Sequence, residues 1–194
     1  MKIAVYTFPG GTGKTSITAE IALTLDLQVI TNDVYTPLSI LFDDKSLLRL
    51  KPNQNIPNLS KDTDIIFDLG GYPDKRAISA LRQSDYILVP TLTETGRLKV
   101  TLSSVNEIIK INKNIIIIVN QAEKGDIDII KKAIPKFPVF EIKRSRAIPN
   151  ILTEKKSVNE MVKEGGLKKY HFKIVAEQFN AIIKYIRGKH GRKG

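Results

Sequence analysis

Residues Gly10-Gly11-Thr12-Gly13-Lys14-Thr15-Ser16 are the most informative segment of this 194-residue chain. They follow an apolar, β-branched run at residues 3–7 and open a stretch, residues 15–25, in which apolar side chains recur every four residues. That spacing is typical of a helix. Glycines let backbone N–H groups surround phosphate oxygens, and a helix amino terminus adds the positive end of its dipole. The segment therefore predicts a phosphate-binding loop between a strand and a helix.

Such a loop would bind the phosphates of a nucleotide. We expect Lys14 to reach the β- and γ-phosphates and stabilise the transferring charge, and the Thr15 hydroxyl to ligate Mg²⁺. The remaining loop residues are expected to cradle the phosphates: Gly10, Gly11, Thr12, Gly13 and Ser16. The match to G-x-x-x-x-G-K-[ST] is imperfect, since Phe8 stands where the first glycine belongs. The alternative is a glycine turn that merely starts a helix.

Short apolar runs recur along the chain and predict the fold class. They lie at residues 3–7, 27–31, 65–68, 86–89, 115–119 and 139–141, with helical patterns at 15–25 and 98–111. Short continuous runs are typical of buried parallel strands, and alternation of strand and helix predicts a mostly parallel sheet with helices on both faces. We therefore expect a single α/β domain, a three-layer sandwich, over residues 1–194, with residues 37–61 its least regular part. Ligands bind such sheets at the carboxyl ends of the strands.

The end of the chain carries another helical pattern. Residues 168–194 begin as a helix, and its apolar face holds Phe172, Val175, Ala176, Phe179, Ile182, Ile183 and Ile186. We expect this face to pack on the core, the alternative being a membrane-surface or partner helix. Residues 188–194 should fray.

Composition restricts the function classes. The net charge is +11, of which residues 1–120 contribute +1 and residues 121–194 contribute +10. This asymmetry favours a polyanion-facing surface, although lysines that merely solvate helix faces are the alternative. The absence of cysteine excludes disulfides, thiolate zinc sites and iron–sulfur ligation by this chain. With neither a leader pattern nor a membrane-spanning apolar run, we expect a cytoplasmic protein.

Three polar residues follow predicted strands. Asp68 would face the phosphate loop and hold Mg²⁺, unless it is a turn or cap residue. Asp33 would orient or deprotonate an attacking water, unless it only forms an Asx-turn. The amide of Asn120 offers a donor and an acceptor, which suits an adenine edge, and a turn-forming Asn is the alternative.

Taken together, these segments resemble the ParA/MinD class of P-loop ATPases, and most closely the short ParA partition proteins. Residues 9–15 are similar to the family loop K-G-G-x-G-K-T, and residues 30–33 to its I-D-x-D segment. Residues 68–71 resemble the metal-binding Asp with switch II, residues 84–90 the A-D-x-x-I-x-P strand, and residues 119–120 the adenine-contacting Asn. Residues 142–146 resemble the I-P-R stretch after the last strand.

The resemblance implies a function in DNA partition. It implies an ATPase with ATP and Mg²⁺ as cofactors that forms an ATP-dependent homodimer, binds nonspecific double-stranded DNA and releases it after hydrolysis. A centromere-binding, ParB-like partner would stimulate turnover, and the protein would associate with the nucleoid. By the same comparison Asp33 takes the water-activating role.

One position departs from the family. The signature lysine, which reaches the partner's phosphates, aligns with Pro9, and proline can neither neutralise charge nor donate a hydrogen bond. ATP binding is therefore a safer expectation than hydrolysis. The alternatives are a nonhydrolysing ATP-dependent DNA-binding switch, a MinD-like membrane-associated positioning ATPase, and a kinase, which the scattered tyrosines disfavour. Five basic residues are candidates for the DNA-facing surface: Lys143, Arg144, Arg146, Lys168 and Lys169.

Overall fold

A seven-stranded parallel sheet forms the centre of the protein. The computed structural model describes residues 1–8, 10–70 and 75–190. The strands lie in the order β3-β2-β4-β1-β5-β6-β7, and every recorded strand pair is parallel. They are β1 (Lys2–Tyr6), β2 (Gln28–Thr31), β3 (Leu47–Arg49), β4 (Ile65–Leu69), β5 (Tyr86–Thr91), β6 (Ile115–Ala122) and β7 (Val139–Lys143).

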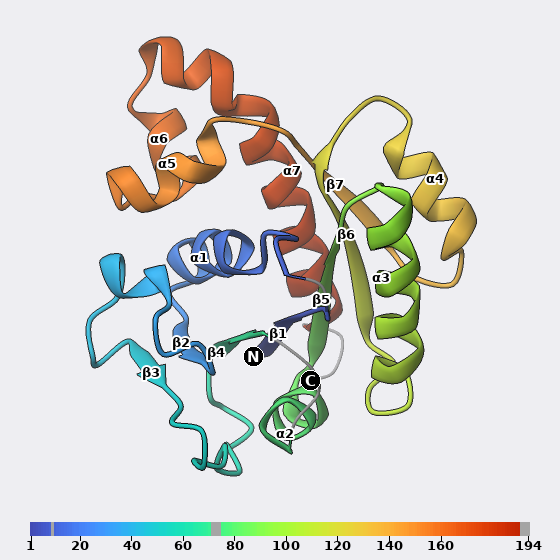
Figure 1. Ribbon diagram of the computed structural model, residues 1–194. Helices are drawn as coiled ribbons and strands as arrows, with labels where there is room; N and C mark the ends of the chain where they lie inside the picture. The colour runs from blue at the N-terminus through green and yellow to red at the C-terminus, as the bar shows by residue number, and fades with distance from the viewer. Residues whose placement is uncertain (9, 71–74, 191–194) are drawn as a thin grey trace.

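Helices cover both faces of this sheet (Figure 1). On one face, α1 (Lys14–Leu25) and α7 (Gly166–His190) pack against the strands, and α5 (Ala147–Glu154) and α6 (Val158–Lys163) pack mainly against these two helices. The other face packs against α2 (Lys75–Gln83), α3 (Thr95–Ile108) and α4 (Asp126–Ala133). Along β1, Ile3 and Val5 belong to the first core, whereas Ala4 and Tyr6 belong to the second. Because successive side chains of a strand point to opposite faces, this alternation shows a sheet buried on both sides. The predicted three-layer α/β sandwich is confirmed.

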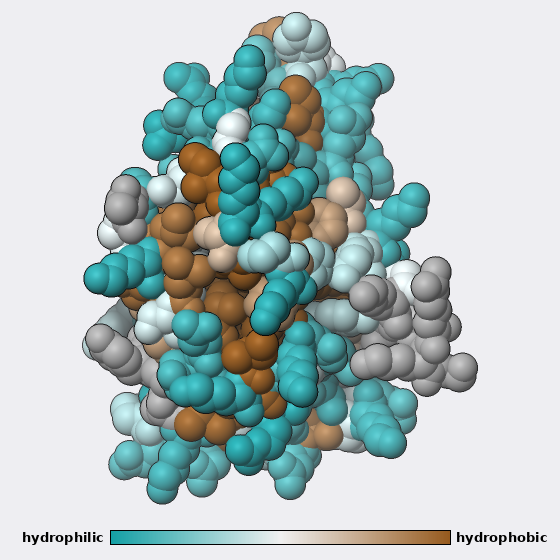
Figure 2. All heavy atoms as spheres, turned by 90° about the vertical axis from the view of Figure 1, so that its right-hand side faces the viewer, coloured by the Kyte–Doolittle hydropathy of each residue, from teal (hydrophilic) through white to brown (hydrophobic). Residues whose placement is uncertain are grey.

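The outer surface around α3 and α4 is mixed in character. Figure 2 shows hydrophobic residues gathered in the middle of the side that is on the right in Figure 1, with hydrophilic residues around them. Val100 of α3 and Ile129 of α4 are each about half exposed. Among the helices of the described residues, none combines the length and apolar character needed to cross a bilayer.

The register of the central strands positions the site. Strand β1 lies between β4 and β5, and Val5 is opposite Asp68 of β4. Since the strands are parallel, their carboxyl ends meet at one edge of the sheet, where α1 begins. The end of β4 therefore lies beside the loop that follows β1.

The last helix packs as its pattern predicts. All seven apolar residues of the predicted face are at most 8% exposed, and all of them except Ile183 join the core on the α1 side of the sheet. We expected the chain to fray from Gly188, but α7 continues through His190. Residues 191–194 lie outside the described residues, as do Pro9 and Gly71.

The strand β3 and the start of α3 differ from the sequence prediction. Residues 37–61 contain a short 3-10 helix, η1 (Pro37–Ile40), and the strand β3, which pairs with β2. Strand β3 has only three residues, of which Leu47 is buried whereas Leu48 and Arg49 are exposed, so its two leucines are too short an apolar run to indicate a strand. Helix α3 begins at Thr95, three residues before the predicted start at Leu98.

Candidate functional site: the loop after β1

The loop between β1 and α1 depends on its glycines. Gly11 and Gly13 have φ angles of 73° and 88°, in the left-handed region that favours glycine. Gly13 is the N-cap of α1, and a Cβ atom placed on it would lie 2.1 Å from Nδ2 of Asn120. A side chain at position 13 is therefore excluded both by the backbone and by the neighbouring amide.

Asn120 holds the loop through a hydrogen bond to its backbone. It ends a fully buried run of β6, is 4% exposed, and its Nδ2 donates a hydrogen bond of 2.9 Å to the carbonyl oxygen of Thr12. The amide that the sequence assigned to adenine is thus bound to the phosphate loop in this structure. It also borders a cavity of about 210 Å³, which Gln121 and Arg144 help to line. An adenine contact of Asn120 stays a prediction.

Thr15 and Asp68, the two predicted Mg²⁺ ligands, are joined by a hydrogen bond at the start of α1. The hydroxyl of Thr15 donates to Oδ2 of Asp68 at 3.0 Å, and that of Thr18 donates to Oδ1 at 3.3 Å. Asp68 is 4% exposed, and burial raises its pKa to about 6 against the opposing effects of the two hydroxyls and of Lys14. Burial likewise lowers the pKa of Lys14, against the attraction of Asp68. The charges of Lys14 and Asp68 therefore each influence the pKa of the other.

Asp33 lies at the rim of the site and is exposed. Its Oδ1 accepts the backbone N–H of Tyr35 at 3.0 Å, and its own N–H donates to Oγ1 of Thr31 at 3.1 Å. Asp33 therefore does form the Asx-turn that was the alternative to catalysis. Its charge also contributes to the raised pKa of Asp68, so the two carboxylates lie near each other. The role of Asp33 toward water stays a prediction.

The sequence analysis missed three residues of this site. Asn32 bridges the ends of β2 and β4, and its only sequence signal is its position beside Asp33. Thr18 follows Thr15 by three residues, a spacing that places both hydroxyls on one face of α1. Arg97 donates from Nη1 to the carbonyl oxygen of Gly10 at 2.7 Å, and nothing in the sequence connects α3 to the loop.

The residues present fit a nucleotide with Mg²⁺. Among the described residues, the buried Thr12 hydroxyl oxygen has no hydrogen-bond partner, so the loop carries a polar atom that a ligand could satisfy. The described residues hold no cluster of three or more metal-ligating side chains. Mg²⁺ needs none, because it takes one or two protein ligands and completes its shell with phosphate and water. Thr15 and Asp68 supply that number.

The five basic candidates for DNA binding divide into two groups. Lys143 and Arg144 lie at the end of β7, and Arg144 lines the cavity beside Asn120, where Nη2 donates to Oε1 of Gln121 at 3.4 Å. Arg146 and Lys168 line a separate cavity of about 480 Å³ between α5 and α7. Lys169 lines another cavity, which is bordered by residues of α7.

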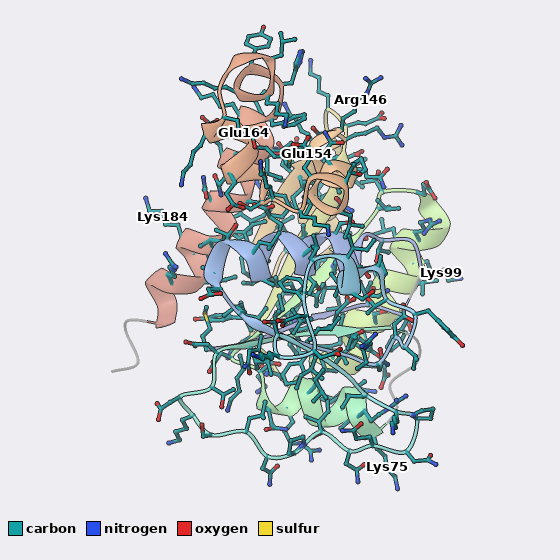
Figure 3. The ribbon with its side chains drawn as sticks, turned by 90° about the vertical axis from the view of Figure 1, so that its left-hand side faces the viewer. Lys75, Lys99, Arg146, Glu154, Glu164 and Lys184 are labelled. Carbon is teal, nitrogen blue, oxygen red and sulfur yellow. The ribbon has the colours of Figure 1, made fainter. Side chains whose placement is uncertain are left out.

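Lys168 differs from the other four because its charge is used within the fold. It forms ion pairs with Glu154 and, at 2.8 Å, with Glu164. Hydrogen bonds from Lys156 and Lys168 lower the pKa of Glu164 to about 2. Figure 3 shows Arg146, Glu154 and Glu164 together at one end of the molecule. Lys168 is therefore a poorer candidate for a DNA phosphate than its exposed neighbour Lys169.

No family model and no curated protein matches this chain. Solved structures do match it along nearly its whole length. The ATP complex of a McdA substitution variant from Cyanothece has a TM-score of 0.68 at 14% identity, covering 97% of this chain and 96% of that chain.

Two further solved structures are similar to this chain. MinD with Mg-ADP from Pyrococcus horikoshii OT3 has a TM-score of 0.64 at 16% identity, covering 95% of this chain and 97% of that one. A ParA family ATPase from Chlorobium tepidum TLS has a TM-score of 0.56 at 16% identity, covering 90% and 98%. The chain thus has the fold of the ParA/MinD P-loop ATPases.

Proposed function

We propose that this chain is an ATPase of the ParA/MinD type that binds Mg-ATP at residues 10–16. The hydrogen bond from Thr15 to Asp68 carries the proposal. It brings a hydroxyl and a buried carboxylate, the two oxygen ligands expected of a P-loop magnesium site, to the start of α1. A bound Mg²⁺ would neutralise phosphate charge there.

The other residues of the site take roles set by their positions. The backbone of the loop and the amino end of α1 bind the phosphates, and Lys14 adds a positive charge whose solvation is already reduced by burial. Asp33, held at the rim by its Asx-turn, orients the attacking water. Asn120 keeps the loop in its binding conformation through Thr12.

We further propose that an ATP-dependent homodimer binds nonspecific double-stranded DNA in partition, with a ParB-like protein as its partner. The surplus of ten positive charges in residues 121–194 supports this part. Arg146 and Lys169 are exposed near the junction of α5 and α7, where they could contact phosphates. Dimerisation would double this basic surface and so make DNA binding depend on the nucleotide.

The predicted apolar face of α7 does not support the membrane alternative. The apolar face of α7 is packed in the core, with Phe179, Ile182 and Ile186 each 0% exposed, so that face is not available to a lipid surface. The nonhydrolysing switch differs from the proposal only in turnover.

Nucleotide binding and turnover test the first part. Wild-type protein should bind Mg-ATP in calorimetry and release phosphate, and Lys14→Ala should lose both. Lys45→Ala is the matched control, because it removes the charge of an exposed lysine that lies outside residues 10–16. Binding without phosphate release would establish the nonhydrolysing switch, and no binding by the wild type would refute the proposal.

Gel shifts test the DNA part. The double variant Arg146→Gln with Lys169→Gln should weaken ATP-dependent DNA binding and flatten its dependence on salt, because fewer counterions are released. The double variant Lys61→Gln with Lys75→Gln removes the same charge elsewhere, and Figure 3 places Lys75 at the opposite end from Arg146. Equal effects of the two variants would locate the DNA surface elsewhere.

A further inference from the structure

Helix α3 contacts the phosphate loop with two side chains from one face. Ser104 is buried and its Oγ accepts the backbone N–H of Phe8 at 3.2 Å, just before the loop. Arg97, seven residues earlier and therefore on the same side of the helix, donates from Nη1 to the carbonyl oxygen of Gly10 at 2.7 Å. Because Ser104 fixes the distance between α3 and the loop, the guanidinium of Arg97 has a defined place above the first glycines.

The guanidinium also depends on Gly11. A Cβ atom on Gly11 would lie 3.2 Å from Nη1 and 3.7 Å from Nη2 of Arg97, so the positive group lies close against the backbone at this position. Its Nε donates to Glu94 at 2.8 Å, which holds the side chain from its other edge. A charged fork is thus positioned over the part of the loop that opens the phosphate cradle.

Two features of Arg97 argue against a purely structural role. It lies in the first turn of α3, where the helix dipole disfavours a positive charge. Its bond to the loop is made to the carbonyl oxygen of Gly10. Gly10 is exposed, so a water molecule could donate a hydrogen bond to that oxygen equally well. An arginine at an electrostatically unfavourable position, held there by a contact that water could replace, is typical of a functional site.

We propose that Arg97 binds the terminal phosphate of the nucleoside triphosphate and makes the site prefer the triphosphate over the diphosphate. The inference rests on the proposed function, since it needs a nucleotide in the loop. A guanidinium has five N–H donors in a planar fork that suits phosphate, and the bonds to Glu94 and Gly10 use two of them. A phosphate oxygen, being charged, is a stronger acceptor than the carbonyl of Gly10. Arg97 therefore exchanges that carbonyl for the phosphate.

Calorimetry with the full chain tests this inference without relying on turnover. Dissociation constants would be measured for a non-hydrolysable ATP analogue and for ADP, each with Mg²⁺. Arg97→Gln should weaken the triphosphate about tenfold or more, as the loss of a charged hydrogen bond requires, and ADP about twofold or less. Lys99→Gln is the matched control, because Lys99 is an exposed cation on the same helix (Figure 3) and should change neither.

The other outcomes separate this inference from the proposed function. Equal weakening of both nucleotides would show that Arg97 only braces the loop, and no weakening would show no role, so either result overturns the inference alone. Wild-type protein that binds neither nucleotide would overturn the proposed function as well. Should Arg97→Gln fail to fold, Arg97→Lys keeps the charge but not the fork, and it should still lose triphosphate affinity selectively. An unchanged ratio of affinities in that variant would refute the role.

Discussion

The side chain of Asn32 exchanges two hydrogen bonds with the backbone of Gly70. Its Nδ2 donates to the carbonyl oxygen at 3.0 Å, and its Oδ1 accepts the N–H at 2.9 Å. This pair joins the ends of β2 and β4, so it holds together the segment with Asp33 and the segment with Asp68.

Replacing Asn32 should show how much its hydrogen bonds to Gly70 contribute to the stability of the fold. Asn32→Ala leaves two backbone groups of Gly70 without their protein partner, so we expect the free energy of unfolding to fall by about 1–3 kcal/mol. Urea denaturation measures this change. The control is Asn53→Ala, an exposed turn residue whose loss should change stability by less than about 0.5 kcal/mol. Equal stabilities of the two variants would contradict the link.

The two glycines at the ends of the loop should respond differently to alanine. Gly13→Ala places a methyl group against Asn120 in a left-handed backbone, so we expect a loss of about 2 kcal/mol or more and loss of nucleotide binding. Gly10→Ala meets no atom within 4 Å and should fold like the wild type. Thermal unfolding with nucleotide titration compares them. A Gly13→Ala protein as stable as Gly10→Ala would mean that the loop tolerates a side chain there.

Glu20 should make stability depend on pH. This residue of α1 is 0% exposed, accepts the N–H of Val158 at 2.7 Å, and burial raises its pKa to about 7 from 4.5. The folded state therefore binds more protons than the unfolded state between these values, so the stability that protonation gives is full below about pH 4.5 and is lost as pH rises through 7.

The variant Glu20→Gln should lack this pH dependence, because it keeps an acceptor for Val158 and cannot ionise. Relative to the wild type, it should gain stability between about pH 5 and about pH 8, by at most about 3 kcal/mol. Denaturant unfolding at both pH values gives the difference, and the exposed Glu177→Gln is the control. Parallel pH profiles of wild type and Glu20→Gln would rule out a buried titrating Glu20.

The variant Asn120→Ala should show whether Asn120 holds the phosphate loop or recognises the adenine base. Because Asn120 holds the carbonyl of Thr12, we expect its loss to weaken ATP, ADP and GTP by a similar factor of about five to tenfold. Calorimetry with the three nucleotides measures this. A loss confined to adenine nucleotides would assign the side chain to the base, and unchanged affinities would remove it from the site.

Much of the fold could be predicted from local pattern. Six of the seven strands and the long helices have runs of apolar residues at the period of their structure, since burial on one or two faces selects those residues. The strand β3 could not be predicted, because its residues are partly exposed and it exists by pairing with β2. The start of α3 was placed three residues late, because Thr95, Gly96 and Arg97 carry no apolar signal.

The phosphate loop follows from local sequence alone, because glycines at fixed positions before Lys14 and Thr15 leave few backbone conformations and place amides around an anion. The order of short apolar runs is likewise enough to specify a parallel α/β sheet. Which distant residues join the loop is settled by the packed fold. Asp68, Asn120 and Arg97 come from three other elements, and their contacts follow from strand order and from how α3 packs, which depend on the whole core rather than on any short segment.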